Sequence, residues 1–115
     1  MSDCIFCKIA NHEIDSAVVY EDDEVIAFKD LSPQAPVHVL AIPKTHTASL
    51  SALTAETSPV AGRIISEIMP RLAQELGVAD KGYRVVVNTG EEGGQTVGHL
   101  HFHLLGGRSM TWPPG

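Results

Sequence analysis

Three histidines alternate with apolar residues near the C-terminal end of the chain, in the segment His99-Leu100-His101-Phe102-His103. In a β-strand successive side chains point to opposite faces, so the three imidazoles would share one face and the apolar side chains the other. Such a cluster could supply a nucleophile, proton donors, or three ligands to a catalytic zinc ion. An exposed strand that happens to be rich in histidine is the plainer alternative. Three of the chain's six histidines in strict alternation favour a functional site.

A glycine-rich segment, Gly93-Gly94-Gln95-Thr96, lies just before the histidines. Its backbone N–H groups, the Gln95 amide and the Thr96 hydroxyl could bind an anionic oxygen without a lysine-rich surface. A pair of glycines is also typical of an ordinary loop between strands. Its position next to the histidines favours the anion-binding interpretation.

The sequence Cys4-x-x-Cys7 supplies two thiols close to the N-terminus. In a cytosolic protein such cysteines are more often reduced, as metal ligands or bystanders, than joined as a structural disulfide. Two thiols do not complete a tetrahedral zinc site, so two further ligands would be needed. A thioredoxin-like redox role would require a βαβ context, which the N-terminal sequence lacks.

Other residues are candidates for binding a nucleotide. Asp30 ends a predicted strand, where its carboxylate could accept both ribose hydroxyls or simply stabilise a turn. Asn88 could contact the substrate near the phosphate or cap the end of a strand. An apolar slot for a base, or part of the core, could be formed by Ile5, Phe6, Ile9, Phe28 and Leu31. His12 and His38 lie outside these motifs, and we assign them no function.

The elements that must position these residues follow from hydrophobic periodicity. Segments 18–21 and 25–29 are β-prone and flank an acidic turn, which predicts a hairpin. The loop 30–36 contains two prolines and leads into a predicted buried strand, 38–42. Two more strands are predicted at 83–88 and 99–105. With the helix described next, this order predicts an α+β fold with a five-stranded, mainly antiparallel sheet.

One long helix is predicted after Thr57, because apolar residues recur there at three- and four-residue spacing. Its apolar stripe comprises Val60, Ile64, Ile65, Ile68, Leu72 and Leu76. Ser58 can cap its start with Pro59 at the first helical position, and Gly77 suits the residue just past its end. Pro70 lies inside the stripe and predicts a kink, because proline removes a backbone hydrogen bond.

Composition limits the class of protein. A chain of 115 residues fits a single domain, 1–115, and its net charge of −6 argues against binding to a nucleic-acid backbone. The longest apolar runs are far too short to cross a membrane, and no secretory signal is evident. We therefore expect a cytoplasmic protein.

The triad segment resembles the H-φ-H-φ-H-φ-φ signature of the histidine triad (HIT) superfamily, and further segments resemble its histidine-triad nucleotide-binding branch, in the bacterial form with an N-terminal CxxC. These segments are Asp30 to Pro36, Ile42-Pro43-Lys44-x-His46, Gly82-Tyr83-Arg84 through Asn88, Gly93 to Thr96, and Trp112-Pro113-Pro114-Gly115. The related nucleotidylyltransferases usually end the triad with Gln, so His103 favours hydrolysis over transfer. Two departures are Thr96, where Ser is frequent, and Gly98, where other members carry an aromatic residue.

The resemblance implies a HIT-like fold with a short N-terminal helix, and a purine nucleoside phosphoramidase that needs no cofactor for catalysis. Such an enzyme cleaves the P–N bond of a nucleoside 5′-phosphoramidate, with an AMP-like purine nucleotide as the expected ligand. His101 would attack the phosphorus, His103 would donate to the phosphoryl oxygens, and His99 would complete the catalytic cluster with His46. Nucleotide contacts are expected from Asp30, Leu31, Asn88, Gly94, Gln95, Thr96, His101, Phe102 and His103.

The resemblance also implies structural zinc, held by Cys4, Cys7, His46 and His99, and a homodimer in which one sheet continues across both subunits. The C-terminal tail, 106–115, would then reach toward the partner's site. Alternatively the tail, with Trp112, folds back on its own domain. Three rival functions remain at this level: a nucleotide-binding module without turnover, a dinucleoside polyphosphate hydrolase, and a metalloenzyme that uses the three triad histidines.

Overall fold

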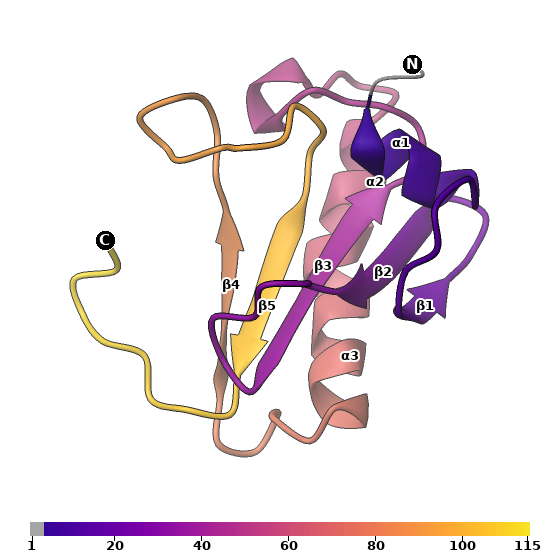
Figure 1. Ribbon diagram of the computed structural model, residues 1–115. Coiled ribbons are helices and arrows are strands. Elements are labelled where there is room, and N and C mark those ends of the chain that lie inside the picture. The colour runs from indigo at the N-terminus through magenta and orange to yellow at the C-terminus, as the bar shows by residue number, and fades with distance from the viewer. Residues whose placement is uncertain (1–3) are drawn as a thin grey trace.

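The computed structural model describes residues 4–115 and is built on one antiparallel sheet (Figure 1). Its strands are β1 (Val18–Glu21), β2 (Val25–Lys29), β3 (Val37–Pro43), β4 (Tyr83–Val87) and β5 (Phe102–Gly106). They are arranged in the order β1-β2-β3-β5-β4. A short helix, α1 (Ile5–Ala10), precedes the sheet, and one longer helix connects β3 to β4. The predicted α+β class, with a five-stranded sheet, one long helix and a short N-terminal helix, is confirmed.

The two faces of the sheet carry different layers (Figure 1). The long helix covers one face, and its contact with the strands forms the larger core cluster, which includes Ile64, Leu72, Phe102 and Leu104. Helix α1 covers part of the other face, where Phe6 and Ile9 pack on strand residues such as Phe28. Because side chains alternate along a strand, neighbouring residues of β5 serve different layers.

The triad segment is only partly a strand, which corrects the predicted strand 99–105. Regular pairing in β5 begins at Phe102, which lies opposite Ala41 of β3 and Val87 of β4. The preceding residues are bound elsewhere, since the backbone N–H of Leu100 donates to the carbonyl of Thr47 at 2.7 Å. The three histidines therefore do not share one flat strand face.

The long helix consists of α2 (Ser58–Arg63), a π-helical turn (Ile64–Ile68) and α3 (Met69–Glu75). The irregularity predicted at Pro70 takes the form of this wide turn, in which the N–H of Met69 donates to the carbonyl of Ile64. Since proline has no N–H, a regular α-helix would leave the Ser66 carbonyl without its partner. The wide turn puts Pro70 in the first turn of α3, where a missing donor is tolerated.

Both ends of the long helix were predicted from capping residues, with different outcomes. Gly77 adopts a φ of 78° just after the helix, and its N–H donates to Gln74 while the N–H of Val78 donates to Ala73. This is the expected glycine-dependent terminus. At the start, Ser58 is itself helical and the cap position is Thr57. Ile65, a member of the predicted apolar stripe, is 51% exposed.

One short element completes the described chain, a 3-10 turn (Leu50–Ala52) between β3 and the long helix. No helix within residues 4–115 combines the length and the apolar character needed to cross a membrane.

Candidate active site and metal centre

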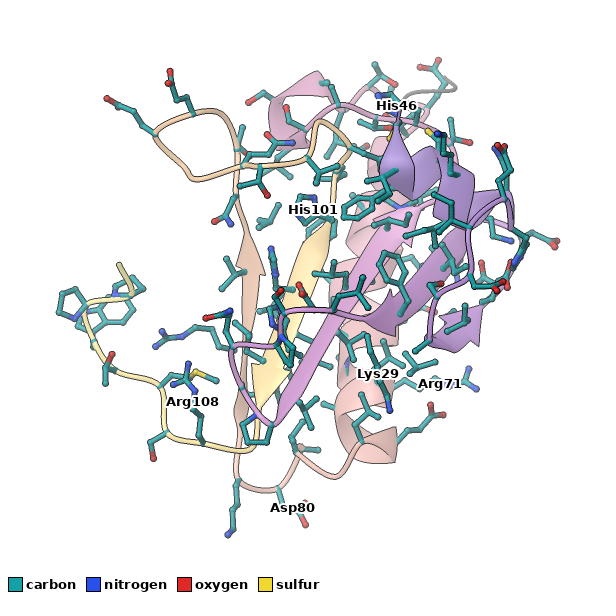
Figure 2. All side chains as sticks on the ribbon, in the orientation of Figure 1. Lys29, His46, Arg71, Asp80, His101 and Arg108 are labelled. Carbon is teal, nitrogen blue, oxygen red and sulfur yellow. The ribbon has the colours of Figure 1, made fainter. Side chains whose placement is uncertain are left out.

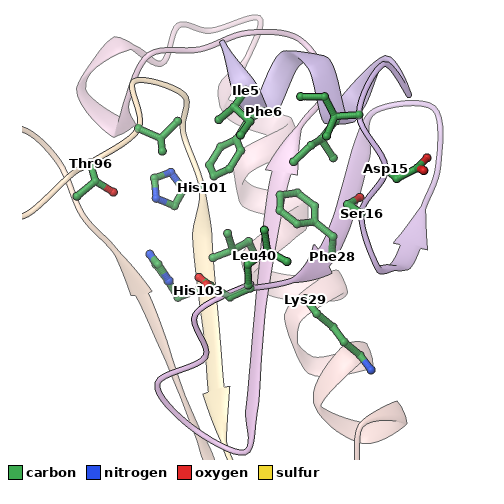
Figure 3. A pocket seen from close by; sticks show the side chains of 15 residues that line it. Ile5, Phe6, Asp15, Ser16, Phe28, Lys29, Leu40, Thr96, His101 and His103 are labelled. Carbon is green, nitrogen blue, oxygen red and sulfur yellow. The ribbon is translucent and has the colours of Figure 1, made fainter.

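A pocket of about 270 Å³ lies on the α1 face of the sheet (Figure 3). His101, His103 and Thr96 stand at one end, and apolar side chains from α1, β2 and β3 form its middle. All five residues predicted for a base slot line this pocket: Ile5, Phe6, Ile9, Phe28 and Leu31. Leu31 is at the rim, with 96% of it exposed.

The ring of Phe6 joins the apolar part of the pocket to the histidines. It packs edge-on against Phe28 at 5.6 Å between ring centroids, and against His101 at 5.0 Å. Helix α1 thus builds one wall of the slot and also supports His101, a relation that strand periodicity alone does not reveal.

The orientation of His101 is set by a backbone carbonyl. Its Nδ1 lies 2.7 Å from the carbonyl oxygen of His99. A carbonyl oxygen can only accept, so Nδ1 carries the proton and donates it. In the neutral ring Nε2 then has a free lone pair, which is the form a nucleophile requires.

His38, to which the sequence assigned nothing, belongs to this site. It is 7% exposed, its Nδ1 lies 3.0 Å from the backbone nitrogen of Gln34, and its Nε2 lies 2.9 Å from Nδ1 of His103. The Gln34 N–H can only donate, so the proton of His38 is on Nε2 and is donated to His103. Neutral His103 therefore carries its own proton on Nε2.

Burial disfavours a positive charge on the His38–His103 pair. Burial, together with the neighbouring His101 and His38, lowers the pKa of His103 to about 4. Burial also lowers the pKa of His38, against an opposing effect from Asp30. Nε2 of His103 is buried and has no hydrogen-bond partner among residues 4–115. A buried donor without a partner suits a site that receives an acceptor from a ligand.

Asp30 lines the pocket and also has the turn role considered above. Its Oδ1 accepts from the N–H of Ser32 at 2.8 Å, and its Oδ2 is 3.5 Å from Nε2 of His38. A carboxylate offers about four acceptor positions, so both contacts leave capacity for a ligand hydroxyl.

Most of the donors in the glycine-rich loop, which were predicted to bind an anionic oxygen, are used within the protein. The N–H of Gly94 donates to Glu91 and that of Gln95 donates to Gly90, while the Gln95 side-chain amide binds Ala48, Gly90 and Val97. These donors hold the loop in shape, so within this segment only Thr96 lines the pocket. Gly93 is required sterically, because a Cβ there would lie 2.2 Å from the Thr89 oxygen.

Two other predicted contacts do not reach the pocket. The Phe102 side chain is fully buried in the core beneath the long helix, on the opposite face of the sheet, so it cannot touch a ligand in the pocket. Asn88 directly follows β4, is half-buried, and does not line the pocket.

A second cluster combines Cys4, Cys7, His46 and His99, whose ligand atoms all lie within 4.8 Å of one another. Nδ1 of His99 is 3.3 Å from Sγ of Cys4, and Nδ1 of His46 is 3.2 Å from Sγ of Cys7. Two sulfurs and two imidazole nitrogens are a donor set typical of structural zinc.

The tautomer of His99 fits a metal ligand. Its Nε2 lies 2.8 Å from the carbonyl oxygen of Pro43 and must donate to it, which leaves the Nδ1 lone pair directed at the sulfurs. Burial lowers the pKa of His99, which favours the neutral form that a metal requires. Both ring nitrogens of His99 therefore face groups outside the pocket. The contact of His99 with His101 is made by its backbone carbonyl and not by its imidazole.

Fold and site together define an α+β protein with an imidazole-centred pocket next to a Cys2His2 cluster. The model of the HIT domain matches residues 11–110. A HIT family hydrolase from Legionella pneumophila has a TM-score of 0.94 and 49% sequence identity, covering 98% of this chain and 100% of that one.

Relatives known from sequence agree with this match. An uncharacterised HIT-like protein of Synechococcus elongatus is 54% identical over 113 residues, covering 98% of this chain and 97% of its own length. A 14 kDa zinc-binding protein of Brassica juncea is 46% identical over 115 residues, covering 98% of this chain and 100% of its own. The chain belongs to the HIT family, as its triad indicated.

Proposed function

We propose that this protein is a purine nucleoside phosphoramidase, which hydrolyses the P–N bond of nucleoside 5′-phosphoramidates. The observation that carries this proposal is the pairing of complementary tautomers in one pocket: a free lone pair on Nε2 of His101 and a proton on Nε2 of His103. One can attack an electrophilic phosphorus while the other donates to its oxygens.

In the first step Nε2 of His101 forms a bond to the 5′-phosphorus, and the P–N bond breaks. The leaving nitrogen departs as an amine after taking up a proton. In the second step water attacks the nucleotidyl-histidine, releases the nucleoside monophosphate, regenerates His101 and returns a proton to solvent. Two displacements replace one difficult displacement, which is the advantage of covalent catalysis.

The remaining pocket residues would bind the nucleotide. Thr96 lines the pocket and its hydroxyl would donate to a phosphoryl oxygen, and the Asp30 carboxylate would accept from the ribose hydroxyls. The base would occupy the apolar slot beside Phe6 and Phe28. Gly94 and Gln95 would contribute by shaping the loop that carries Thr96.

Charge favours a phosphoramidate over a dinucleoside polyphosphate. The only cationic side chain lining the pocket, within residues 4–115, is Lys29. A second hollow shares Thr96 with this pocket, and its lining includes Glu91 but no Lys or Arg of the described chain. A polyphosphate chain needs cations to offset its charge, whereas an amine leaving group does not.

Structural zinc is part of the proposal. Cys4, Cys7, His46 and His99 would hold the ion, and its binding would stabilise the junction between α1, the end of β3 and the segment before β5. The two cysteines are not joined as a disulfide, which fits the reducing cytoplasm.

We also propose a homodimer formed through β4. This strand is an edge of the sheet, and Tyr83 and Val85 are each 37% exposed on it. The C-terminal segment runs outward on the β4 side, and 81% of Trp112 is exposed (Figure 1). An unpaired edge and an exposed indole are features that a partner subunit would cover.

Steady-state turnover tests the substrate class. We expect adenosine 5′-phosphoramidate to be hydrolysed with a kcat/KM at least tenfold above that for diadenosine polyphosphates. A higher kcat/KM for diadenosine polyphosphates would contradict the phosphoramidase and identify a polyphosphate hydrolase. Tight nucleotide binding without turnover of either substrate would instead identify a binding module.

A further inference from the structure

The pocket has a second polar end, which the proposed reaction does not use. Asp15 and Ser16 line it on the side away from His101 and His103, beyond the ring of Phe28 (Figure 3). A nucleotide has the same sequence of chemical character along its length: an anionic phosphate, a ribose, a flat apolar base, and a base edge with donors and acceptors. With the phosphate at His101 and the base beside Phe28, the edge of the base would lie toward the Asp15 end of the pocket.

We propose that Asp15 reads the edge of the base and selects guanine over adenine. This inference rests on the proposed function, because it requires a nucleotide bound with its phosphate at the histidines. Asp15 thereby becomes a specificity-determining residue for the purine.

The selectivity follows from hydrogen-bond chemistry. An ionised carboxylate only accepts, and it can accept two parallel hydrogen bonds from adjacent donors. Guanine presents such a pair, N1–H and the N2 amino group, on one edge. Adenine presents a single donor there, the N6 amino group, beside N1, which is an acceptor. A carboxylate facing adenine therefore loses one hydrogen bond and meets an unfavourable acceptor.

The Asp15 carboxylate is available for this contact. It forms no hydrogen bond or ion pair with any residue between 4 and 115, unlike Glu21, which is paired with Lys44 and His12. Lys29, the cation that lines the same pocket, extends away from Asp15 in Figure 3. The carboxylate, which is turned away from Phe28 in Figure 3, would reach a base by rotation of its exposed side chain, without first breaking an internal contact.

The loop that carries Asp15 is attached at both ends. On one side the N–H of Glu13 donates to the carbonyl of Lys8 in α1, at 2.8 Å. On the other side the N–H of Lys29 in β2 donates to the carbonyl of Ala17, at 3.0 Å. Both neighbouring elements also form walls of the pocket, so the backbone that carries Asp15 is held next to the base slot and only the side chain must be ordered on binding.

The experiment compares guanosine, inosine and adenosine 5′-phosphoramidates with the wild-type protein. We expect kcat/KM for guanosine to exceed that for adenosine by about tenfold, the effect of a hydrogen bond to a charged group that remains partly solvated. Inosine, which keeps N1–H but lacks the N2 amino group, should fall between them. Equal values for all three substrates would overturn the proposal.

Variants locate the effect. Asp15→Ala should abolish the preference for guanosine, and Asp15→Asn should shift it toward adenosine, because an amide supplies an acceptor for N6 and a donor for N1. Glu13→Gln removes a nearby exposed carboxylate that does not line the pocket, so it should keep the wild-type preference. A guanosine preference that survives in Asp15→Ala would overturn the assignment.

Binding separates this inference from the proposed reaction. Calorimetric dissociation constants for GMP and AMP should show the same Asp15-dependent preference, whether or not a phosphoramidate is turned over. Preferential GMP binding with no turnover would contradict the phosphoramidase and retain the role of Asp15. Turnover of the phosphoramidates together with equal binding of GMP and AMP would retain the phosphoramidase and contradict the role of Asp15.

Discussion

The carbonyl oxygen of His99 accepts a hydrogen bond from Nδ1 of His101 at 2.7 Å. The imidazole of the same His99 faces the sulfurs of Cys4 and Cys7, at 3.3 and 3.5 Å. One residue therefore belongs to the Cys2His2 cluster through its side chain and supports His101, the proposed nucleophile, through its backbone. Figure 2 shows His101 at the top of β5, with His46 on the same side of the molecule toward the N-terminus.

Removing the proposed zinc ion should lower the stability of the protein more than it lowers the rate of the chemical step. For Cys7→Ser we expect loss of bound zinc and a fall in Tm of about 10 °C or more, which corresponds to roughly 2 kcal/mol for a domain of this size. Zinc content by elemental analysis and thermal unfolding by circular dichroism would check this. A zinc-free variant with an unchanged Tm would contradict a structural role.

Replacing His38 should disturb the tautomer of His103 while leaving its side chain in place. His38→Ala deletes the donor that fixes the His103 tautomer, and we expect kcat to fall by about 10- to 100-fold with little change in KM. His38→Gln retains an N–H donor and should recover part of the loss. Nitrogen NMR of His103 provides a direct readout, since the Nε2–H tautomer should dominate in the wild type and be mixed in His38→Ala. An unchanged tautomer in that variant would argue for a merely structural His38.

Acid should destabilise the protein through its buried histidines. The pKa of His103 is lowered to about 4 from an ordinary value of 6.5, so between these values the unfolded chain binds more protons than the folded one. The free energy of unfolding should therefore fall as the pH is lowered from about 6.5 to about 4. Denaturant unfolding across this range should give a smaller pH slope for His103→Gln. Equal slopes would show that another group causes the loss.

The proposed dimer can be tested at its edge strand. Val85→Asp places a charge on β4, and we expect it to yield a monomer, because burying an unpaired carboxylate in an interface is unfavourable. Val18→Asp is a matched control, since Val18 is similarly exposed, at 41%, on β1 at the other edge of the sheet. Light scattering after size-exclusion chromatography distinguishes the outcomes. A Val85→Asp variant that remains dimeric would show that the dimer interface does not include β4.

Local patterns predicted most of the fold. The hairpin of β1 and β2, the buried β3 and the glycine terminus at Gly77 depend on alternation and turn chemistry within a few residues. The strand assignment failed at His99, because the hydrogen bond from Leu100 to Thr47 spans distant parts of the chain. Once the start of β5 is known, the alternation of side chains along the strand places Phe102 on the face covered by the long helix, opposite to the face of His101 and His103.

The sequence motifs predicted which residues meet in the site for His101 and His103, which line the pocket, and for the two cysteines, which cluster with His46 and His99. His38 was missed because its role depends on the pairing of β3 with β5, which brings it to His103 across 65 residues. A polar residue inside a predicted buried strand was the available signal. Gln95 was assigned to a ligand because its partner Ala48, 47 residues away, is invisible to local sequence analysis.

The central claim is that His101 is the nucleophile, and intact mass spectrometry during turnover tests it most directly. Mixing the protein with adenosine 5′-phosphoramidate and quenching rapidly should reveal a transient species heavier by one adenylyl group, absent from a folded His101→Ala variant that has lost turnover. Full turnover by His101→Ala, or an adduct that persists in this variant, would contradict the account.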